Sequence, residues 1–114
     1  MKIGIAVTTT PKRAELFETC LKHILLNSAE HFLYVHNDEQ YNGIAYSKNK
    51  CLEALMDEGC DYLFLFDDDC WPTKHGWESV FINSGLNHSA LTFTKLANGK
   101  SNGNLIRKTQ NGID

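Results

Sequence analysis

The stretch YLFLFDDDCWP, residues 62–72, decides how this chain can fold, because an apolar run ends there in three consecutive aspartates. A short run of aromatic and aliphatic residues is typical of a strand that is buried on both faces, as in a parallel sheet. If the strand continues through the aspartates, Asp67 and Asp69 project to one side and Asp68 to the other, since side chains alternate along an extended chain. The stretch therefore predicts a buried strand that presents carboxylates at its end.

Two similar apolar runs lie upstream, and a helical pattern follows each of them. Ile3–Val7 and HFLYVHND (residues 31–38) predict strands that end in polar, turn-forming segments. Apolar residues at helical spacing predict helices over residues 12–27 and 44–59, with Gly59 as the C-terminal cap of the second. The residues expected to face the sheet are Leu16, Phe17, Cys20, Leu21, Ile24 and Leu25 in the first helix, and Ile44, Lys48, Cys51, Leu52, Leu55 and Met56 in the second.

Strand, helix, strand, helix, strand is the order of parallel βαβ units. It predicts an α/β fold, a Rossmann-like open and mostly parallel sheet with helices on both faces. Beyond residue 72 a weaker pattern predicts a helix over residues 76–86, a strand over residues 90–94 and a polar, turn-rich tail with hairpin character over residues 96–114. With 114 residues, the chain is expected to form a single domain over residues 1–114.

The composition restricts the classes of partner. The net charge is -3 and the Lys and Arg residues are scattered, which gives no general attraction to nucleic acid or to anionic membranes. The apolar run at the N-terminus is too short for a signal peptide or a membrane span, so a cytoplasmic location is the expectation. The four cysteines lack the spacing of a zinc site and are expected to be reduced, mostly buried thiols.

In an open parallel sheet, ligands bind in the crevice beyond the carboxyl ends of the strands. The three loops expected there are TTTPKR, HNDEQYNG and DDDCWP. Their candidate site residues are Thr8, Thr9, Arg13, Asn37, Asp38, Asp67, Asp68 and Asp69. Adjacent carboxylates raise each other's proton affinity unless a cation lies between them, and oxygen ligands favour Mg²⁺ or Mn²⁺, which could hold a diphosphate. A plainer interpretation stays open, in which the triplet is a solvated strand end and one Asp caps a turn.

Three segments share their order and spacing with a known family. They are IGIAVTTTPKRAELFETCLKHI (residues 3–24), LYVHNDEQYNGIAYSKNKCLEAL (residues 33–55) and DYLFLFDDDCWPTKHGW (residues 61–77). They resemble the nucleotide-sugar-binding half of GT-A glycosyltransferases, especially the family 2 type, over about residues 2–94. The resemblance implies a metal-dependent glycosyltransferase, or its donor-binding half, with Mn²⁺ or Mg²⁺ as cofactor, a nucleoside-diphosphate sugar as donor and the hydroxyl of an unknown acceptor.

The same resemblance implies roles for single residues. The positions that match nucleotide-binding residues of the family are Thr8, Thr9, Arg13, Asp38, Lys48 and Asn49. The DxD motif of the family falls on Asp67, Asp68 and Asp69. In this match, Asp67 and Asp68 contact the ribose or the donor sugar, and Asp67 and Asp69 hold the metal. No residue matches a catalytic base.

The chain also departs from the family. The first loop has TTTPKR where an aromatic residue and an Asn are frequent, and the chain ends at Asp114, where the acceptor half would begin, so a truncated GT-A-like fold is expected. The alternative is a non-catalytic nucleotide or nucleotide-sugar binding module that needs a partner or a second half. Self-association through the open sheet is a further expectation. A metal-dependent phosphohydrolase is disfavoured, because DDDC lacks a hydroxyl residue at the fourth place of the nucleophile loop.

Five residues have two interpretations each, and for Lys48 these are a phosphate contact and an ordinary solvated helix residue. His75 could contact a phosphate or act as a base, or it could be an ordinary exposed loop residue. Trp71 and Trp77 could wall a sugar pocket or pack beneath the loop. Cys70 could be a nucleophile, but no His is placed in the sequence to activate it.

Overall fold

The computed structural model describes residues 1–85, 90–95 and 101–107, the last two ranges by their backbone alone. The chain forms two compact units, Met1–Glu78 and Ser79–Asp114. In the first unit, strands and helices alternate along the chain in the predicted order. The strands are β1 (Ile3–Thr9), β2 (Phe32–Asn37) and β3 (Tyr62–Asp67), and the helices are the 3-10 helix η1 (Pro11–Arg13), α1 (Ala14–Asn27) and α2 (Ile44–Asp57).

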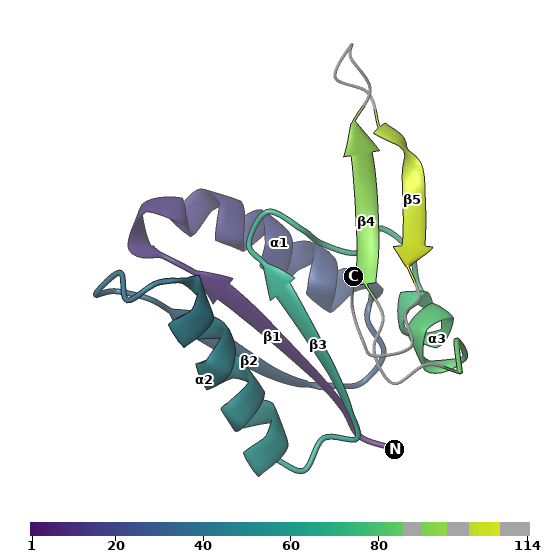
Figure 1. The fold of residues 1–114 in the computed structure, drawn as a ribbon, viewed down its shortest axis with the longest axis horizontal. Helices are drawn as coiled ribbons and strands as arrows, with labels where there is room; N and C mark the ends of the chain where they lie inside the picture. Colours follow the sequence, from purple (N-terminus) through teal and green to yellow (C-terminus); the bar gives the residue numbers. More distant parts are fainter. Residues whose placement is uncertain (86–89, 96–100, 108–114) are drawn as a thin grey trace. The chain divides into compact units, whose positions relative to one another are not determined.

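The three strands form a parallel sheet in the order β2-β1-β3 (Figure 1). Within it, Thr8 of β1 lies between His36 of β2 and Asp67 of β3. The chain passes from β1 to β2 on one side and then crosses to β3 on the other side of β1. The direction of the connections therefore reverses between β1 and β3. The prediction of an open, parallel α/β sheet is confirmed for this unit.

β1 is the core of the unit, and all of its residues are buried. On one face of the sheet, Ala6 packs against Cys51 and Leu55 of α2. The opposite face carries Ile5 and Val7 and lies toward α1, as Figure 1 shows with α2 in front of the sheet and α1 behind it. Helices on both faces explain why this strand has no polar alternation.

The helix α2 turns a narrower face to the sheet than its sequence predicts. Its buried residues are Ser47, Cys51 and Leu55. Ile44 and Met56 are 65% and 67% exposed, and Leu52 is 36% exposed, so the prediction that these three face inward is wrong. The buried positions repeat every four residues from Ser47, and this repeat places the other apolar residues toward the side or the outer surface of the helix.

The ends of both helices follow the sequence signals. Pro11 opens the 3-10 turn η1, and α1 continues from it to Asn27, with Cys20 and Ile24 buried as predicted and Leu25 56% exposed against the prediction. After α2, Gly59 adopts a φ of 80°, and its N–H donates to the carbonyl of Met56 (3.0 Å). This left-handed residue is the predicted glycine cap.

Gly4 of β1 lies where the end of α2 meets the sheet. A Cβ at this position would be 2.6 Å from Sγ of Cys60 and 3.0 Å from Cδ2 of Leu55. Glycine therefore permits the close approach of these two side chains to the strand.

The second unit contains an antiparallel hairpin, in which β4 (Ala90–Lys95) pairs with β5 (Ser101–Arg107). The predicted strand over residues 90–94 is confirmed, and β5 falls within the predicted turn-rich tail. Residues 96–100 and 108–114 of that tail lie outside the described residues. The helix α3 (Trp77–Ile82) spans the boundary between the two units. None of the helices in the described ranges is long and apolar enough to cross a bilayer.

Candidate functional site

The carboxyl ends of β1 and β3 carry two Thr–Asp pairs. Oγ1 of Thr8 donates to Oδ1 of Asp67 (3.2 Å), and Oγ1 of Thr9 donates to Oδ2 of Asp68 (2.9 Å). Because side chains alternate along a strand, the first pair lies on the α2 side of the sheet and the second on the α1 side. Both pairs lie where the connections reverse direction, which is the place where open parallel sheets bind ligands.

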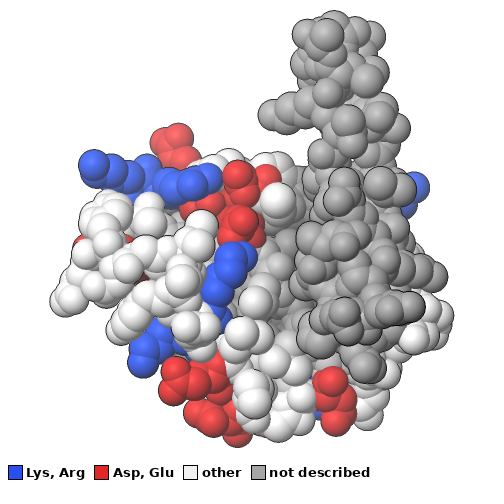
Figure 2. Space-filling model, in the orientation of Figure 1, with Lys and Arg blue, Asp and Glu red and all other residues white. Residues whose placement is uncertain are grey.

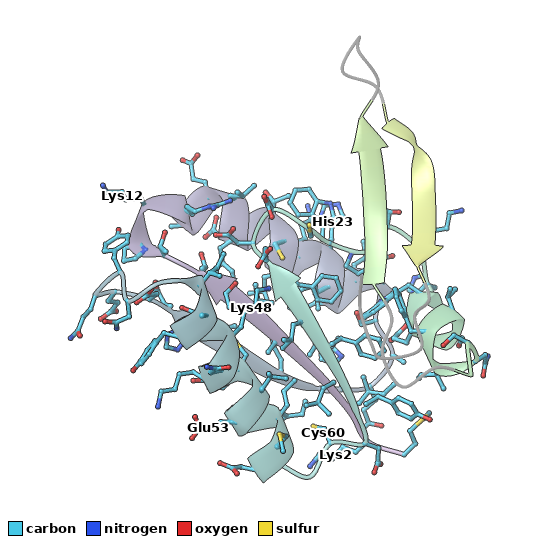
Figure 3. The ribbon with its side chains drawn as sticks, viewed as in Figure 1. Lys2, Lys12, His23, Lys48, Glu53 and Cys60 are labelled. Atoms are coloured by element: carbon cyan, nitrogen blue, oxygen red, sulfur yellow. The ribbon has the colours of Figure 1, made fainter. Side chains whose placement is uncertain are left out.

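Lys48 joins α2 to the first pair. Its ammonium lies 2.9 Å from Oδ1 of Asp67, the oxygen that also accepts from Thr8. In Figure 3 Lys48 projects from α2 toward the ends of β1 and β3. The side chain of Asp67 is 42% exposed, so the ion pair borders solvent and contributes little to the free energy of folding. Either side chain can therefore leave this pair for another partner at a small cost in free energy.

Asp68 has the most deeply buried side chain of the triplet, with 4% of it exposed. Its Oδ2 accepts from Thr9, and its Oδ1 lies 2.9 Å from the guanidinium of Arg13. The same guanidinium is 3.7 Å from Oδ2 of Asp69, whose side chain is 57% exposed. Both oxygens of Asp68 thus have protein partners. This carboxylate links β1, η1 and the segment after β3, and its environment gives no support to the ribose contact that the family resemblance implies.

The aspartate triplet does not continue the strand. β3 ends at Asp67, and the N–H of Cys70 donates to the carbonyl of Asp67 (3.1 Å), which closes a turn. The thiol of Cys20 on α1 donates to the carbonyl of Cys70 (3.2 Å) and so ties the turn to α1. The premise that alternation extends from Asp67 to Asp69 is therefore wrong. The alternation holds for Asp67 and Asp68, and Asp69 shares the guanidinium of Arg13 with Asp68.

Asp38 organises the loop between β2 and α2. Its Oδ1 accepts from the N–H of Asn42 (2.9 Å) and its Oδ2 from the N–H of Gly43 (3.0 Å). Chiefly the hydrogen bond from Asn42, and also that from Gly43, hold the pKa of Asp38 below its ordinary value, against the effect of its burial. The residue is 5% exposed. Asp38, to which the family resemblance gives a nucleotide-binding role, therefore caps the loop in which it lies.

His36 borders the site, and the sequence reasoning did not select it. It neighbours Thr8 in the sheet, and its ring packs edge-on against Tyr46 of α2, with 5.9 Å between the centroids. Its Nε2 is buried and has no hydrogen-bond partner among the described residues. The one signal in the sequence was its position at the end of the second strand, two residues before Asp38.

Two of the other candidates lie on the surface. Asn49 is exposed on α2, and the hydrogen bonds of the described residues do not connect it to the aspartates. His75 is exposed, as the plainer interpretation of this residue predicts.

The tryptophans pack against aromatic neighbours. The ring of Trp77 meets Phe64 and Phe66 edge-on, at 4.9 and 5.3 Å between centroids. Its indole N–H donates to Ser28 (3.1 Å). Trp71 stacks on His23 of α1 at 5.3 Å. For Trp77 these contacts favour packing over a sugar-binding wall.

All four cysteines are free thiols, two of them buried and one half-buried, as the sequence predicts. Burial, with a smaller effect of the aspartates, raises the pKa of Cys20 to about 12. Cys70 is exposed, yet partial burial and then Asp69 raise its pKa too. A thiol with a raised pKa forms little thiolate, which argues against Cys70 as a nucleophile.

The donor atoms of the cluster are carboxylate and hydroxyl oxygens, which suit Mg²⁺ or Mn²⁺. Among the described residues, no group of three or more His, Cys, Asp or Glu side chains is placed to hold a metal ion. Mg²⁺ is commonly bound by one or two carboxylates together with the phosphates of a substrate, rather than by an all-protein cage. The described residues thus offer oxygen donors at this edge of the sheet but no preformed metal cage.

The charges on this part of the surface are interleaved. Figure 2 shows acidic side chains flanked by basic ones over the ends of the strands. The ion pairs of the half-exposed Asp67 with Lys48 and of the exposed Asp69 with Arg13 contribute to this pattern.

A hollow of about 440 Å³ lies at the opposite, amino end of the sheet. It is lined by Met1, Lys2, Ile3, Glu30, His31, Phe32 and Glu58. The ammonium of Lys2 pairs there with Glu58 (2.6 Å). In Figure 3 Lys2 and Lys48 lie at opposite ends of the sheet, so this hollow is separate from the Thr–Asp pairs.

The predicted convergence of distant loops is thus seen in the first unit. The residues brought together by hydrogen bonds or ion pairs are Thr8, Thr9, Arg13, Lys48, Asp67, Asp68 and Asp69. Asp38 adjoins them, since its N–H donates to the carbonyl of Thr9 (2.9 Å). Compared with models of protein families, with curated proteins and with solved structures, the chain matches none of them.

Proposed function

We propose that the chain binds a nucleoside-diphosphate sugar together with Mn²⁺ or Mg²⁺, as the donor-binding part of a GT-A-like glycosyltransferase. The observation that carries this proposal is the contact of Asp67 with Lys48 at the reversal point of a parallel sheet. A carboxylate that can hold a cation and an ammonium that can hold a phosphate lie there side by side. The same family resemblance that named these residues supports the choice of ligand.

The exposed carboxylates have the ligand-facing roles in this proposal. Asp67 and Asp69, at 42% and 57% exposure of their side chains, hold the metal. Lys48 and Arg13 balance the negative charge of the diphosphate, while Asp68 fixes Arg13 and Thr9 in position. The bound metal would stabilise the departing nucleoside diphosphate as an acceptor hydroxyl attacks the sugar. Asp38 keeps the loop before α2 in shape for the nucleotide.

The test is a thermal-shift panel of UDP-, GDP-, CMP- and dTDP-sugars, each with Mn²⁺ and with a chelator. A ligand that binds only the folded state raises the melting temperature, by an amount that grows with its concentration over Kd. We expect one class of nucleotide sugar to stabilise the protein with Mn²⁺ and to do so far less with the chelator.

Two variants locate the effect. Asp67→Asn and Asp69→Asn should fold and lose the Mn²⁺-dependent shift. Asp57→Asn is the matched control, because Asp57 is an exposed carboxylate at the far end of α2. A full shift in both cluster variants, or no shift with any nucleotide sugar in the wild type, would refute the assignment.

A binding module without transfer activity is the second candidate. The observation that favours it is that each aspartate of the triplet lies within 4 Å of Lys48 or Arg13, which leaves no unpaired carboxylate of the triplet as a general base. The discriminating measurement is release of nucleoside diphosphate from the stabilising nucleotide sugar by the chain alone. Release above the rate of an Asp67→Asn control favours the transferase, and binding without release favours the module.

A further inference from the structure

Asp67 already has a cation before any ligand arrives. Lys48 and Thr8 contact the same atom, Oδ1 of Asp67, at 2.9 and 3.2 Å. The side chains of Lys48 and Asp67 are 35% and 42% exposed, so the pair is accessible to ions from solvent. The most exposed residue of the triplet, Asp69, is reached by the guanidinium of Arg13 at 3.7 Å.

These pairs leave the triplet with little net charge. Three carboxylates face two protein cations, Lys48 and Arg13, so one negative charge remains uncompensated. A divalent ion that binds either oxygen of Asp67 also places a like charge beside the Lys48 ammonium, and this repulsion, although weakened by solvent, opposes the metal unless the ammonium moves away. The site therefore resists a metal that arrives alone.

We propose that Lys48 is an internal counter-ion that competes with the metal for Asp67 and moves to a phosphate oxygen of the ligand when the metal binds. This inference rests on the proposed function. The ammonium of lysine is a point charge on a flexible four-carbon stem, so it can change partners without moving the helix. Arg13 has no such freedom, because it holds the buried Asp68.

The exchange couples the two ligands. A diphosphate gives the displaced ammonium a new partner, so it lowers the free energy required for the metal to occupy Asp67. By linkage, the metal then raises the affinity for the diphosphate by the same factor. Without Lys48, the metal has no competitor at Asp67 and the diphosphate loses one cation.

The experiment measures Mn²⁺ binding from the electron paramagnetic resonance signal of the free ion. It compares the wild type with Lys48→Met and Lys48→Gln. The control is Lys50→Met, which removes the same charge two residues away, from a side chain that lies over Tyr46 and near Glu53. We expect Lys48→Met and Lys48→Gln to bind Mn²⁺ alone at least about fivefold more tightly than the wild type and Lys50→Met do.

A second titration repeats the measurement in the presence of UDP and of GDP. The nucleotide that tightens Mn²⁺ binding to the wild type should tighten it less in the Lys48 variants. If Mn²⁺ alone binds the Lys48 variants no more tightly than Lys50→Met, the competition is refuted while the metal site stands. If none of the four proteins binds Mn²⁺, with or without either nucleotide, both the inference and the proposed function fail.

Discussion

Thr9 and Asp68, which are 59 residues apart in the sequence, are joined by a 2.9 Å hydrogen bond between buried side chains. Asp68 also pairs with Arg13, so a single carboxylate ties the end of β1 to η1 and to the turn after β3. This relationship divides the triplet into a structural member, Asp68, and two exposed members. The division leads to different expectations for three chemically identical residues.

Replacing Asp68 should destabilise the fold. Asp68→Ala leaves the Thr9 hydroxyl with only its 3.5 Å contact to the carbonyl of Thr10 and Arg13 without its close partner. We expect this loss to lower the free energy of unfolding by about 1–3 kcal/mol. Asp69→Ala removes only an exposed carboxylate and should change it by less than about 0.5 kcal/mol. Urea unfolding of both variants checks this. Equal losses would show that Asp68 is not a structural residue.

The loop cap at Asp38 should make stability depend on pH. The pKa of Asp38 is lowered in the folded protein, so the unfolded chain takes up the proton first as the pH falls. The contribution of Asp38 is therefore full above the ordinary pKa of aspartate, near 3.8, and is lost as the pH falls through the lower folded value. The wild type should be more stable than Asp38→Ala at neutral pH, and the difference should shrink toward about pH 3. A difference that stays constant would contradict this role.

Gly4 should not tolerate even a methyl group. In Gly4→Ala the new Cβ would meet Sγ of Cys60 at 2.6 Å, and overpacking of this kind costs about 1–3 kcal/mol. Cys60→Ala removes that sulfur, so Gly4→Ala should cost less in the Cys60→Ala background than in the wild type. A double-mutant cycle measured by urea unfolding gives the coupling, and additive effects would rule out this contact as the cause.

The unpaired Nε2 of His36 predicts that an apolar ring is tolerated there. His36→Phe removes a buried polar atom without a described partner, so the variant should be as stable as the wild type or more stable by about 1 kcal/mol. His31→Phe is the comparison, because the ring of His31 has a hydrogen-bond contact with the carbonyl of Ala29 (2.7 Å). This variant should lower the free energy of unfolding by about 0.5–1.5 kcal/mol. A clear loss in His36→Phe would mean that Nε2 has a partner in solution.

The order of elements and the meeting of the loops could be predicted because both follow from periodicity. Short apolar runs alternating with helical patterns leave few arrangements other than parallel βαβ units, and parallel strands end at one edge of the sheet. That rule alone placed Thr8 near Asp67 and Arg13 near Asp68. It needed no knowledge of individual contacts.

The predictions that were wrong concern features for which the local sequence allows more than one conformation. Three aspartates can extend a strand or turn away from it, and the turn at Asp67 is fixed by backbone hydrogen bonds and by Cys20 on another helix. The rotation of α2 could not be predicted because apolar residues such as Ile44 and Met56 occupy more than one side of it. The lack of a described hydrogen-bond partner for Nε2 of His36 depends on the strand register, which local sequence does not determine.

The position of β1 between β2 and β3 has a consequence for synthesis on the ribosome. The 59 residues from Thr8 to Asp67 take roughly 3 to 12 seconds to translate at about 5–20 residues per second. β1 can pair with β2 once residues 32–37 have emerged, but until then and afterwards the edge that β3 will cover has no strand to pair with, and it is a target for chaperones and for other nascent chains. The Thr–Asp contacts form only when the end of β3 has emerged, so a nascent chain that ends before Asp67 lacks both of them.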